Sequence, residues 1–173
     1  LFRDDPYAKD CEATVTAVND RGGIVLDRTV FYPTGGGQAG DSGHLHVAGG
    51  DSITIATAVN GEAPDEVVLV PAEGQTPPPI GATVRAEIDW PQRQRRMRIH
   101  TCLHLLSAIL PYPVTGGSVG DGKGRLDFDM PELNMDKEEI TARLNELVGG
   151  GHEVRARWIS DAELAAQPDL VKT

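Results

Sequence analysis

The strongest constraint on the fold is the residue pattern of the first half of the chain, where short β-branched segments alternate with turn residues. Cys11 to Val18 alternates in polarity, Asn19 to Gly23 supplies a turn, and the chain returns through Gly23 to Asp27. Further segments of this kind cover residues 29–32, 44–47, 52–57, 67–70 and 83–88. Strands this short, separated by turns this frequent, predict a small sandwich or barrel.

After the last of these strands the pattern changes to helical spacing. Asp89 is a suitable N-cap, Pro91 suits a first helical turn, and apolar residues then recur on one face as far as Leu110. Beyond it we expect a glycine-rich loop at 115–124, a strand at 125–128, a helix at 136–148, a strand at 154–159 and a short helix from Ser160. The predicted fold class is α+β, with a β-barrel-like domain at 1–88 and an α+β domain at 89–173.

Charge excludes one large class of function. The 173 residues carry 16 basic and 26 acidic side chains, a net charge of −10, which argues against a broad basic face for non-specific nucleic-acid binding. Arg93, Arg95, Arg96 and Arg98 nevertheless cluster with no acidic residue among them. Such a cluster indicates either a local contact with an anionic partner or the solvated start of a helix.

Hydropathy and cysteine content indicate a globular cytoplasmic protein. Hydrophobic residues make up 39% of the chain, but no run reaches the ~18 apolar residues that a membrane-spanning helix needs. The two cysteines, Cys11 and Cys102, do not form a disulfide framework, which favours a reducing compartment. We therefore expect no membrane partner.

The most specific chemical signal is the pair His100 and His104. Residues four apart lie on one face of a helix with Cβ atoms about 5–6 Å apart, a separation that lets two imidazoles share one metal ion. Thr101 follows the first histidine, so the pair is not the H-E-x-x-H motif. Cys102 lies about 200° around the helix from His100 and does not complete the site. The pair is either half of a tetrahedral zinc site or two histidines that only form hydrogen bonds.

A second signal is the run from Pro33 to Gly43, which contains three consecutive glycines. The glycines allow backbone N–H groups to approach a ligand closely, and Thr34 and Gln38 would supply side-chain donors and acceptors. No Gly-Lys-Ser/Thr sequence follows, so the run is not a P-loop. It is either a bulged corner of a hairpin or a binding loop.

Two further signals are weaker. The glycine-rich stretch from Gly116 to Phe128 carries Lys123 and Arg125, which either meet a phosphate or belong to a simple connection. His44 and His46 point to one face of a strand, as two metal ligands would, but we interpret them as ordinary polar positions.

The combination of these segments is more specific than any one of them. The first is Phe31-Tyr32-Pro33-Thr34-Gly35-Gly36-Gly37-Gln38, with Asp41 and Gly43 behind it. The second is His100-Thr101-Cys102-Leu103-His104, and the third is Gly117-Ser118 followed by Arg125-Leu126-Asp127-Phe128. In this order they resemble the motifs of alanyl-tRNA synthetase editing domains and of their freestanding relatives, the AlaX-type alanyl-tRNA editing proteins. The resemblance implies a small β-barrel-like domain followed by an α/β domain resembling the threonyl/alanyl-tRNA synthetase editing domain.

The same resemblance implies a reaction and a cofactor. It implies a trans-editing deacylase that hydrolyses the ester of tRNA(Ala) mischarged with serine or glycine. It also implies zinc, held by His100 and His104 together with a Cys and a His of a later C-x-x-x-H segment. No such segment follows His104 in this sequence. We expect it to lie beyond Thr173, the alternative being a variant poor in metal.

The site residues expected from the resemblance form three groups. Candidate catalytic residues are Thr34, Gln38 and Asp127; the first two would read the serine hydroxyl, and Asp127 is included for its place in the motif. Candidates for binding the substrate or the tRNA acceptor stem are Gly35, Gly36, Gly37, Ser118, Arg125, Arg93 and Arg96, with Arg95 and Arg98 beside them. The expected metal ligands are His100 and His104.

Three other functions stay open. The first is a non-catalytic RNA- or metabolite-binding module of the same fold without its metal, and the second is the editing module of a full alanyl-tRNA synthetase. The third is a general metallohydrolase built on the histidine pair, which would act on small esters independently of tRNA. We expect a monomer.

Overall fold

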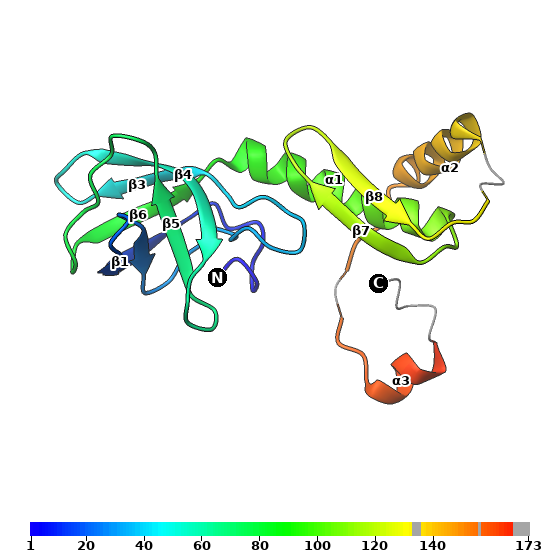
Figure 1. The fold of residues 1–173 in the computed structure, drawn as a ribbon, viewed down its shortest axis with the longest axis horizontal. Helices are drawn as coiled ribbons and strands as arrows, with labels where there is room; N and C mark the ends of the chain where they lie inside the picture. The colour runs from blue at the N-terminus through cyan, green and yellow to red at the C-terminus, as the bar shows by residue number, and fades with distance from the viewer. Residues whose placement is uncertain (133–135, 156, 168–173) are drawn as a thin grey trace. The chain divides into compact units, whose positions relative to one another are not determined.

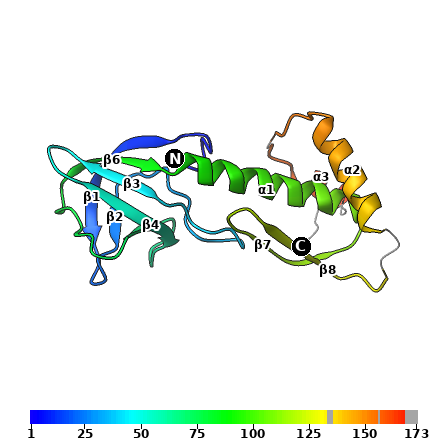
Figure 2. The same cartoon turned by 90° about the horizontal axis from the view of Figure 1, so that it is seen from above.

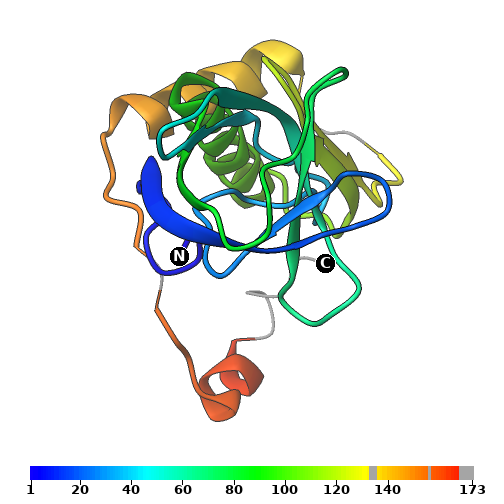
Figure 3. The same cartoon turned by 90° about the vertical axis from the view of Figure 1, so that its left-hand side faces the viewer.

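Six short strands form a closed barrel in the first half of the chain. The computed structural model describes residues 1–132, 136–155 and 157–167. The strands are β1 (Asp10–Val18), β2 (Ile24–Leu26), β3 (Gly43–Val47), β4 (Ser52–Asn60), β5 (Val67–Pro71) and β6 (Thr83–Ile88). Each pairs antiparallel with its neighbours in the order β1-β2-β5-β4-β3-β6, and β6 closes the ring by pairing with β1 (Figure 1; Figure 3). The predicted barrel and the α+β fold class are confirmed.

Alternation along the strands fills the barrel with apolar side chains. Leu45 of β3 and Ile55 of β4 are fully buried, while the residues next to them in each strand are more exposed. Leu45 lies opposite Ala86 of β6, so side chains from neighbouring strands meet inside the ring. Burying one large apolar side chain contributes about 1.5–3 kcal/mol to stability. The barrel is therefore a firm support for the long connection between β2 and β3, which carries the glycine-rich run.

The rest of the chain combines helices with a two-stranded sheet. Its elements are α1 (Trp90–Ile109), β7 (Val114–Val119), β8 (Gly124–Phe128), α2 (Lys137–Gly149) and α3 (Asp161–Ala166). The β7–β8 hairpin lies beside α1, where a Cβ atom at Gly124 would come within 2.7 Å of Ile99 (Figure 2). Asp136 caps α2, and Ser160 caps α3 in a capping box with Glu163.

The chain divides into two compact units, Leu1–Arg96 and Met97–Thr173, and the division falls within α1. The boundary expected from the sequence lies before this helix, after Ile88. The first turns of α1 belong to the barrel unit because Trp90 packs against the barrel core and Arg93 and Arg96 are buried. None of the helices in the described residues is both long enough and apolar enough to cross a membrane.

Three predicted elements are wrong in the described residues. Residues 29–32 form no strand, because Val30 and Phe31 are inserted into the core. Residues 114–119 form strand β7 rather than a loop, because Gly116 and Gly117 pair with β8, where a Cβ atom at Gly117 would approach a backbone oxygen at 3.1 Å. The alternation at 154–159 produces no strand in its described part: the pattern has no ladder partner there, and Trp158 is 100% exposed.

Candidate functional site

The glycine-rich run folds into a tight turn on the rim of the barrel unit. Gly35 and Gln38 exchange two backbone hydrogen bonds, N–H of Gly35 to O of Gln38 at 3.1 Å and N–H of Gln38 to O of Gly35 at 2.9 Å. Between them Gly36 and Gly37 have φ angles of 57° and 77°. Two consecutive left-handed residues define a type I′ turn, which glycine adopts at little cost. A Cβ atom at Gly36 would meet nothing within 4 Å, so one side of the turn is open.

Thr34, which precedes the turn, is fastened to strand β4. Its backbone N–H donates to the carbonyl of Ala58 at 2.8 Å, and its hydroxyl donates to the same carbonyl at 3.2 Å. The hydroxyl also accepts a hydrogen bond from the N–H of Gly40 at 3.0 Å, and Asn60 donates to the carbonyl of Thr34 at 3.0 Å. A hydroxyl has one proton and two lone pairs. Its proton is thus donated to strand β4, and one lone pair is left to accept from a ligand.

Behind the turn, Asp41 and Arg93 form a buried ion pair. Asp41 is 1% exposed and Arg93 is 3% exposed. Nε of Arg93 lies 2.9 and 3.0 Å from the two carboxylate oxygens of Asp41, and Nη2 also donates to this carboxylate. The remaining donors of Arg93 reach the carbonyls of Val30 at 2.7 Å and Pro6 at 3.0 Å, and Asp41 accepts from the N–H of Tyr32 at 2.7 Å. The pair therefore joins α1 to both ends of the glycine-rich run.

Arg96, one helical turn further along α1, holds the same run at its exit. It is 5% exposed, and its Nη1 donates to the carbonyls of Gly40 at 2.8 Å and Ala39 at 3.4 Å. The prediction that Arg93 and Arg96 contact the acceptor stem of a tRNA is therefore corrected. Their guanidinium groups are turned into the protein and bind its own backbone and carboxylate, whereas Arg95, also in the basic cluster, is exposed.

The other predicted loop residues occupy two environments. Gly35 is half-buried, whereas Gly36 and Gly37 are exposed at the turn itself. Gln38 is 6% exposed, so its side chain lies within the loop and not at its surface. Of the two side chains expected to read a hydroxyl, Thr34 is the exposed one. The structure therefore favours Thr34 over Gln38 for direct contact with a ligand.

In the second unit, His100 and His104 lie together on the surface of α1. Both are exposed, and their rings are stacked with centroids 5.0 Å apart and an interplanar angle of 10°. Partial burial, and then the positive charge that His104 can carry, lower the pKa of His100 below its ordinary value of 6.5. A lowered pKa keeps the imidazole neutral, which is the form that binds a metal. Among the described residues, no group of three or more His, Cys, Asp or Glu side chains is arranged to hold a metal ion.

The β7–β8 hairpin brings three further predicted residues to one face. Ser118 lies directly opposite Arg125, and Asp127 lies opposite Gly116 and forms an ion pair with Arg125 at 3.1 Å. Alternation in β8 places these side chains on the face opposite to Gly124, the residue that contacts α1. The structure therefore groups Asp127 with Ser118 and Arg125 and does not group it with the histidine pair on α1.

The two histidines of the barrel, His44 and His46, lie beside each other on strand β3. His46 lies 3.0 Å from a carboxylate oxygen of Glu87 on the outer face of the barrel, and His44 lies beside it with ring centroids 6.1 Å apart. Glu87 also accepts from Arg85 at 2.6 Å. The pair is part of a network of polar side chains on exposed strands.

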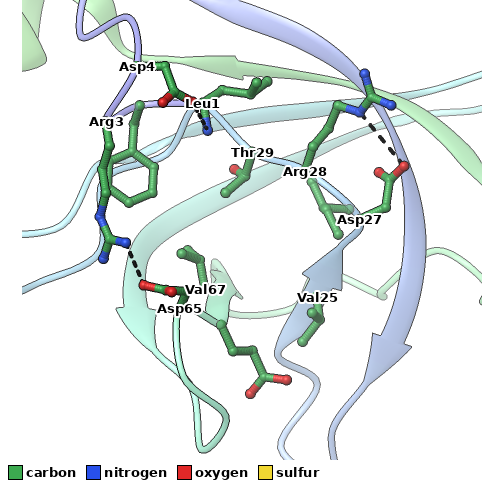
Figure 4. A pocket seen from close by; sticks show the side chains of 12 residues that line it. Leu1, Arg3, Asp4, Val25, Asp27, Arg28, Thr29, Asp65 and Val67 are labelled. Atoms are coloured by element: carbon green, nitrogen blue, oxygen red, sulfur yellow. Dashed lines mark hydrogen bonds and ion pairs between the residues drawn. The ribbon is translucent and has the colours of Figure 1, made fainter.

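A pocket of about 410 Å³ lies elsewhere on the barrel unit, between the N-terminal residues, the end of β2 and the start of β5 (Figure 4). Arg3 pairs with Asp65 at its edge, and Arg28 lies 3.8 Å from Asp27 (Figure 4). None of the predicted site residues lines this pocket. Charged groups of both signs line it, and most of them form exposed ion pairs, so it offers no concentrated charge of one sign to a ligand.

Comparison with known proteins relates these features to a family. The model of the class II (A) tRNA synthetases matches residues 6–92. The alanyl-tRNA editing protein AlaX-M of Pyrococcus horikoshii is 37% identical over 169 residues, which cover 93% of this chain and 74% of that protein. The AlaX-M protein of Methanosarcina mazei is 33% identical over 172 residues, 94% of this chain and 68% of that protein. The chain belongs to the AlaX-type alanyl-tRNA editing proteins.

This chain is also similar to part of a much longer protein. The alanine–tRNA ligase of Pyrobaculum neutrophilum is 36% identical over 152 residues, which cover 85% of this chain but only 16% of the ligase. The match to the synthetase model covers the barrel, the glycine-rich run, Asp41 and the start of α1. It ends before His100 and His104. The family resemblance drawn from the motifs is confirmed.

In this AlaX-type protein, sequence reasoning missed the role of Asp41 and the burial of two arginines. Arg93 and Arg96 are three residues apart and so share one face of a helix, but the exposed Arg95 and Arg98 have the same spacing. The spacing therefore does not show which of the two pairs faces inward. The ion pair itself joins residues 52 positions apart in sequence, and no local pattern indicates it.

Proposed function

We propose that the protein is an aminoacyl-tRNA deacylase that hydrolyses the ester of tRNA(Ala) mischarged with serine or glycine. The relatives are named alanyl-tRNA editing proteins, and removal of an amino acid from a tRNA is the hydrolysis of an ester, which supports the reaction class. The observation that carries the choice of substrate is the geometry of Thr34. Its hydroxyl is held by Ala58 and Gly40 with one lone pair left over, and Thr34 as a residue is exposed beside the glycine turn.

The residues of the loop can recognise an amino acid without taking part in bond breaking. An aminoacyl ester is already activated, so the enzyme needs chiefly to orient it and to stabilise the developing oxyanion. The lone pair of Thr34 would accept a hydrogen bond from the substrate's serine hydroxyl, and the open backbone of Gly36 and Gly37 lets the substrate approach. A pocket that hydrogen-bonds a hydroxyl discriminates strongly against an analogue that lacks it.

We propose zinc as the cofactor, with His100 and His104 as two of its ligands. Two stacked, exposed imidazoles on adjacent turns, one of them with a lowered pKa, are a donor set that suits zinc. Zinc would supply Lewis-acid polarisation of a bound water or of the ester. No group of three or more potential ligands occurs among the described residues. The resemblance to the family implies a Cys and a His of a C-x-x-x-H segment as the other two ligands.

Two surfaces are proposed for the tRNA. The exposed Arg95 and Arg98 of α1 replace the buried arginines as candidates for the acceptor stem. Ser118 and Arg125, on one face of the β7–β8 hairpin, are candidates for a phosphate or ribose contact. Because Asp127 shares the hairpin face with Arg125, we assign it no part at the histidine pair. We also propose that the protein is a cytoplasmic monomer.

A second candidate is a non-catalytic RNA-binding module of the same fold. It is favoured by one observation, namely that no group of three or more potential metal ligands occurs in the part of the chain that the structure describes. The two candidates differ in their response to zinc, since only the deacylase requires a metal at His100 and His104.

One experiment separates them. Zinc content is measured by elemental analysis alongside hydrolysis of Ser-tRNA(Ala), Gly-tRNA(Ala) and Ala-tRNA(Ala), on residues 1–173 and on a chain extended past Thr173. The proposal expects about one zinc per chain with rapid loss of serine and slow loss of alanine from the extended protein. Hydrolysis without metal would remove zinc from the proposal. Absence of both metal and hydrolysis would support the binding module.

A further inference from the structure

We propose that Arg96 and Arg93 are positioning residues that set the amino-acid discrimination of the glycine-rich loop. In this arrangement they act through the backbone of the loop on the hydroxyl of Thr34 and do not touch the substrate. The inference rests on the proposed function, because it concerns how the same loop distinguishes a serine ester from an alanine ester.

The path from Arg96 to Thr34 consists of two hydrogen bonds. Nη1 of Arg96 donates to the carbonyl of Gly40 at 2.8 Å, and the N–H of Gly40 donates to the hydroxyl of Thr34 at 3.0 Å. The hydroxyl in turn donates to Ala58 of β4 at 3.2 Å. The carbonyl of Gly40 is therefore bound by Arg96 of α1, while its N–H orients the hydroxyl of Thr34. Moving Gly40 would change which lone pair of Thr34 faces outward.

Gly40 lies so close to its neighbours that a side chain at this position would clash with them. A Cβ atom at this residue would come within 2.0 Å of the carbonyl of Ala58 and 2.9 Å of Thr34 Oγ1. The backbone of Gly40 is thus in direct contact with β4, and small displacements of the loop would separate them. A guanidinium donor on its carbonyl is the contact that keeps it there from the α1 side.

Arg93 holds the other parts of the loop. It binds the carboxylate of Asp41 after the turn and the carbonyl of Val30 before it, and Asp41 also accepts from the N–H of Tyr32 at 2.7 Å. Both stems of the loop are consequently attached to one helix. Burial of two guanidinium groups is costly and gives weak net stability, so their placement here is better explained by the geometry that they impose.

The competing explanation is that the two arginines only stabilise the barrel unit. A purely structural role predicts that an Arg96 variant loses activity on all esters in parallel with its loss of folded protein. A positioning role predicts a change in the ratio of the rates for two esters on the same tRNA, measured on folded protein. The ratio of kcat/KM for Ser-tRNA(Ala) to that for Ala-tRNA(Ala) is therefore the decisive quantity.

The variant Arg96→Met removes the guanidinium and keeps an unbranched side chain. We expect the serine-to-alanine ratio to fall about tenfold or more, since misplacement of a recognition group by a fraction of an ångström to 1 Å has effects of up to about a hundredfold. Arg96→Lys retains one cationic donor for the carbonyl of Gly40, and we expect it to recover part of the ratio. Arg21→Met, the same chemical change at an exposed arginine in the β1–β2 turn, should leave the ratio unchanged.

A double-variant cycle tests whether Arg96 acts through Thr34. Thr34→Val removes the hydroxyl, so Arg96→Met should lower the ratio no further in the Thr34→Val background. Independent, multiplied effects of the two substitutions would overturn the proposal. So would a ratio within twofold of the wild-type value in Arg96→Met. If Arg96→Met does not fold, Arg96→Lys and Arg93→Lys carry the test, and unchanged ratios in both would overturn it.

Hydrogen exchange keeps this test separate from the proposed function. The amides of Thr34 and Gly40 should exchange faster in Arg96→Met than in wild-type protein, while the barrel strands keep their protection. If wild-type protein does not hydrolyse Ser-tRNA(Ala), the proposed function fails, and exchange then decides whether Arg96 holds the loop. Unchanged exchange at both amides would reject the positioning role whatever the enzymatic result.

Discussion

Replacement of Asp41 by asparagine tests the buried ion pair that supports the glycine-rich loop. Asparagine has the shape of aspartate and keeps an oxygen for the N–H of Tyr32, but it removes the charge that faces Arg93. At 3% exposure, Arg93 cannot recover this interaction from water. Breaking one side of a buried ion pair costs about 3–5 kcal/mol, which is a large part of the ~5–15 kcal/mol that stabilises an ordinary domain.

Urea unfolding measures this loss as a lower midpoint with an unchanged slope. Asp27→Asn is the matched control: Asp27 is 38% exposed, lies 3.8 Å from Arg28, and accepts from the N–H of Thr14 at 2.8 Å, which asparagine can still do. Asp27→Asn should lower the free energy of unfolding by less than about 1 kcal/mol. The double variant Asp41→Asn with Arg93→Met should be less destabilised than the sum of the single variants. A loss below about 1 kcal/mol for Asp41→Asn would refute the reasoning.

Three further predictions concern other parts of the molecule. Gly40→Ala should detach the loop from β4, because its Cβ would lie 2.0 Å from a backbone oxygen, and the thermal midpoint should fall; an unchanged midpoint would show that the loop has room. In metal-free protein the imidazole of His100 should titrate below 6.5 by NMR, and His104→Gln should raise its pKa, since a neighbouring positive charge is removed; a pKa unmoved by this change would argue for burial alone. Arg95→Gln with Arg98→Gln should weaken tRNA binding and reduce its dependence on salt, as measured by titration at several ionic strengths; an identical salt slope would exclude both from phosphate contact.

The barrel could be predicted from the sequence because its information is local. Strands such as β1 and β4 alternate in polarity, and turns such as that at Asn19 to Gly23 carry residues that tolerate left-handed backbone. The helix caps Asp136 and Ser160 are equally local. The histidine pair was predicted for the same reason, since helical spacing alone determines which residues share a face.

Prediction failed where partners distant in sequence decide the outcome. Val30 and Phe31 are typical of a strand, yet they fill the barrel core, and Gly116 and Gly117 are typical of a loop, yet they pair with β8. The charge of Arg93 indicated a solvent-facing patch, although its carboxylate partner is Asp41. A one-dimensional pattern shows that a residue can take part in a ladder or an ion pair, but it does not show whether the partner is there.

From the geometry of Thr34 we expect the serine and glycine esters, which the sequence left equivalent, to respond differently to a change at this residue. Serine and glycine esters differ by the hydroxymethyl group, and the polar atoms that fasten the loop to β4 and to α1 are used within the protein. The remaining lone pair of Thr34 can only accept, so it matches the hydroxyl that the serine ester carries and the glycine ester lacks. We therefore predict that Thr34→Val lowers kcat/KM for Ser-tRNA(Ala) by about tenfold, the value of one ordinary hydrogen bond, and leaves the value for Gly-tRNA(Ala) within about twofold.

Thr34→Ser is the control for this prediction, since it keeps the hydroxyl and loses only the methyl group. It should retain the preference for the serine ester, provided that the shorter side chain still bonds to Ala58 and Gly40. Single-turnover deacylation of both esters on the same tRNA, with thermal melting to confirm folding, provides the comparison. Equal losses on the two esters in Thr34→Val would mean that the hydroxyl only fastens the loop, because a shared structural defect acts on every substrate, whereas recognition acts on the one that carries the donor.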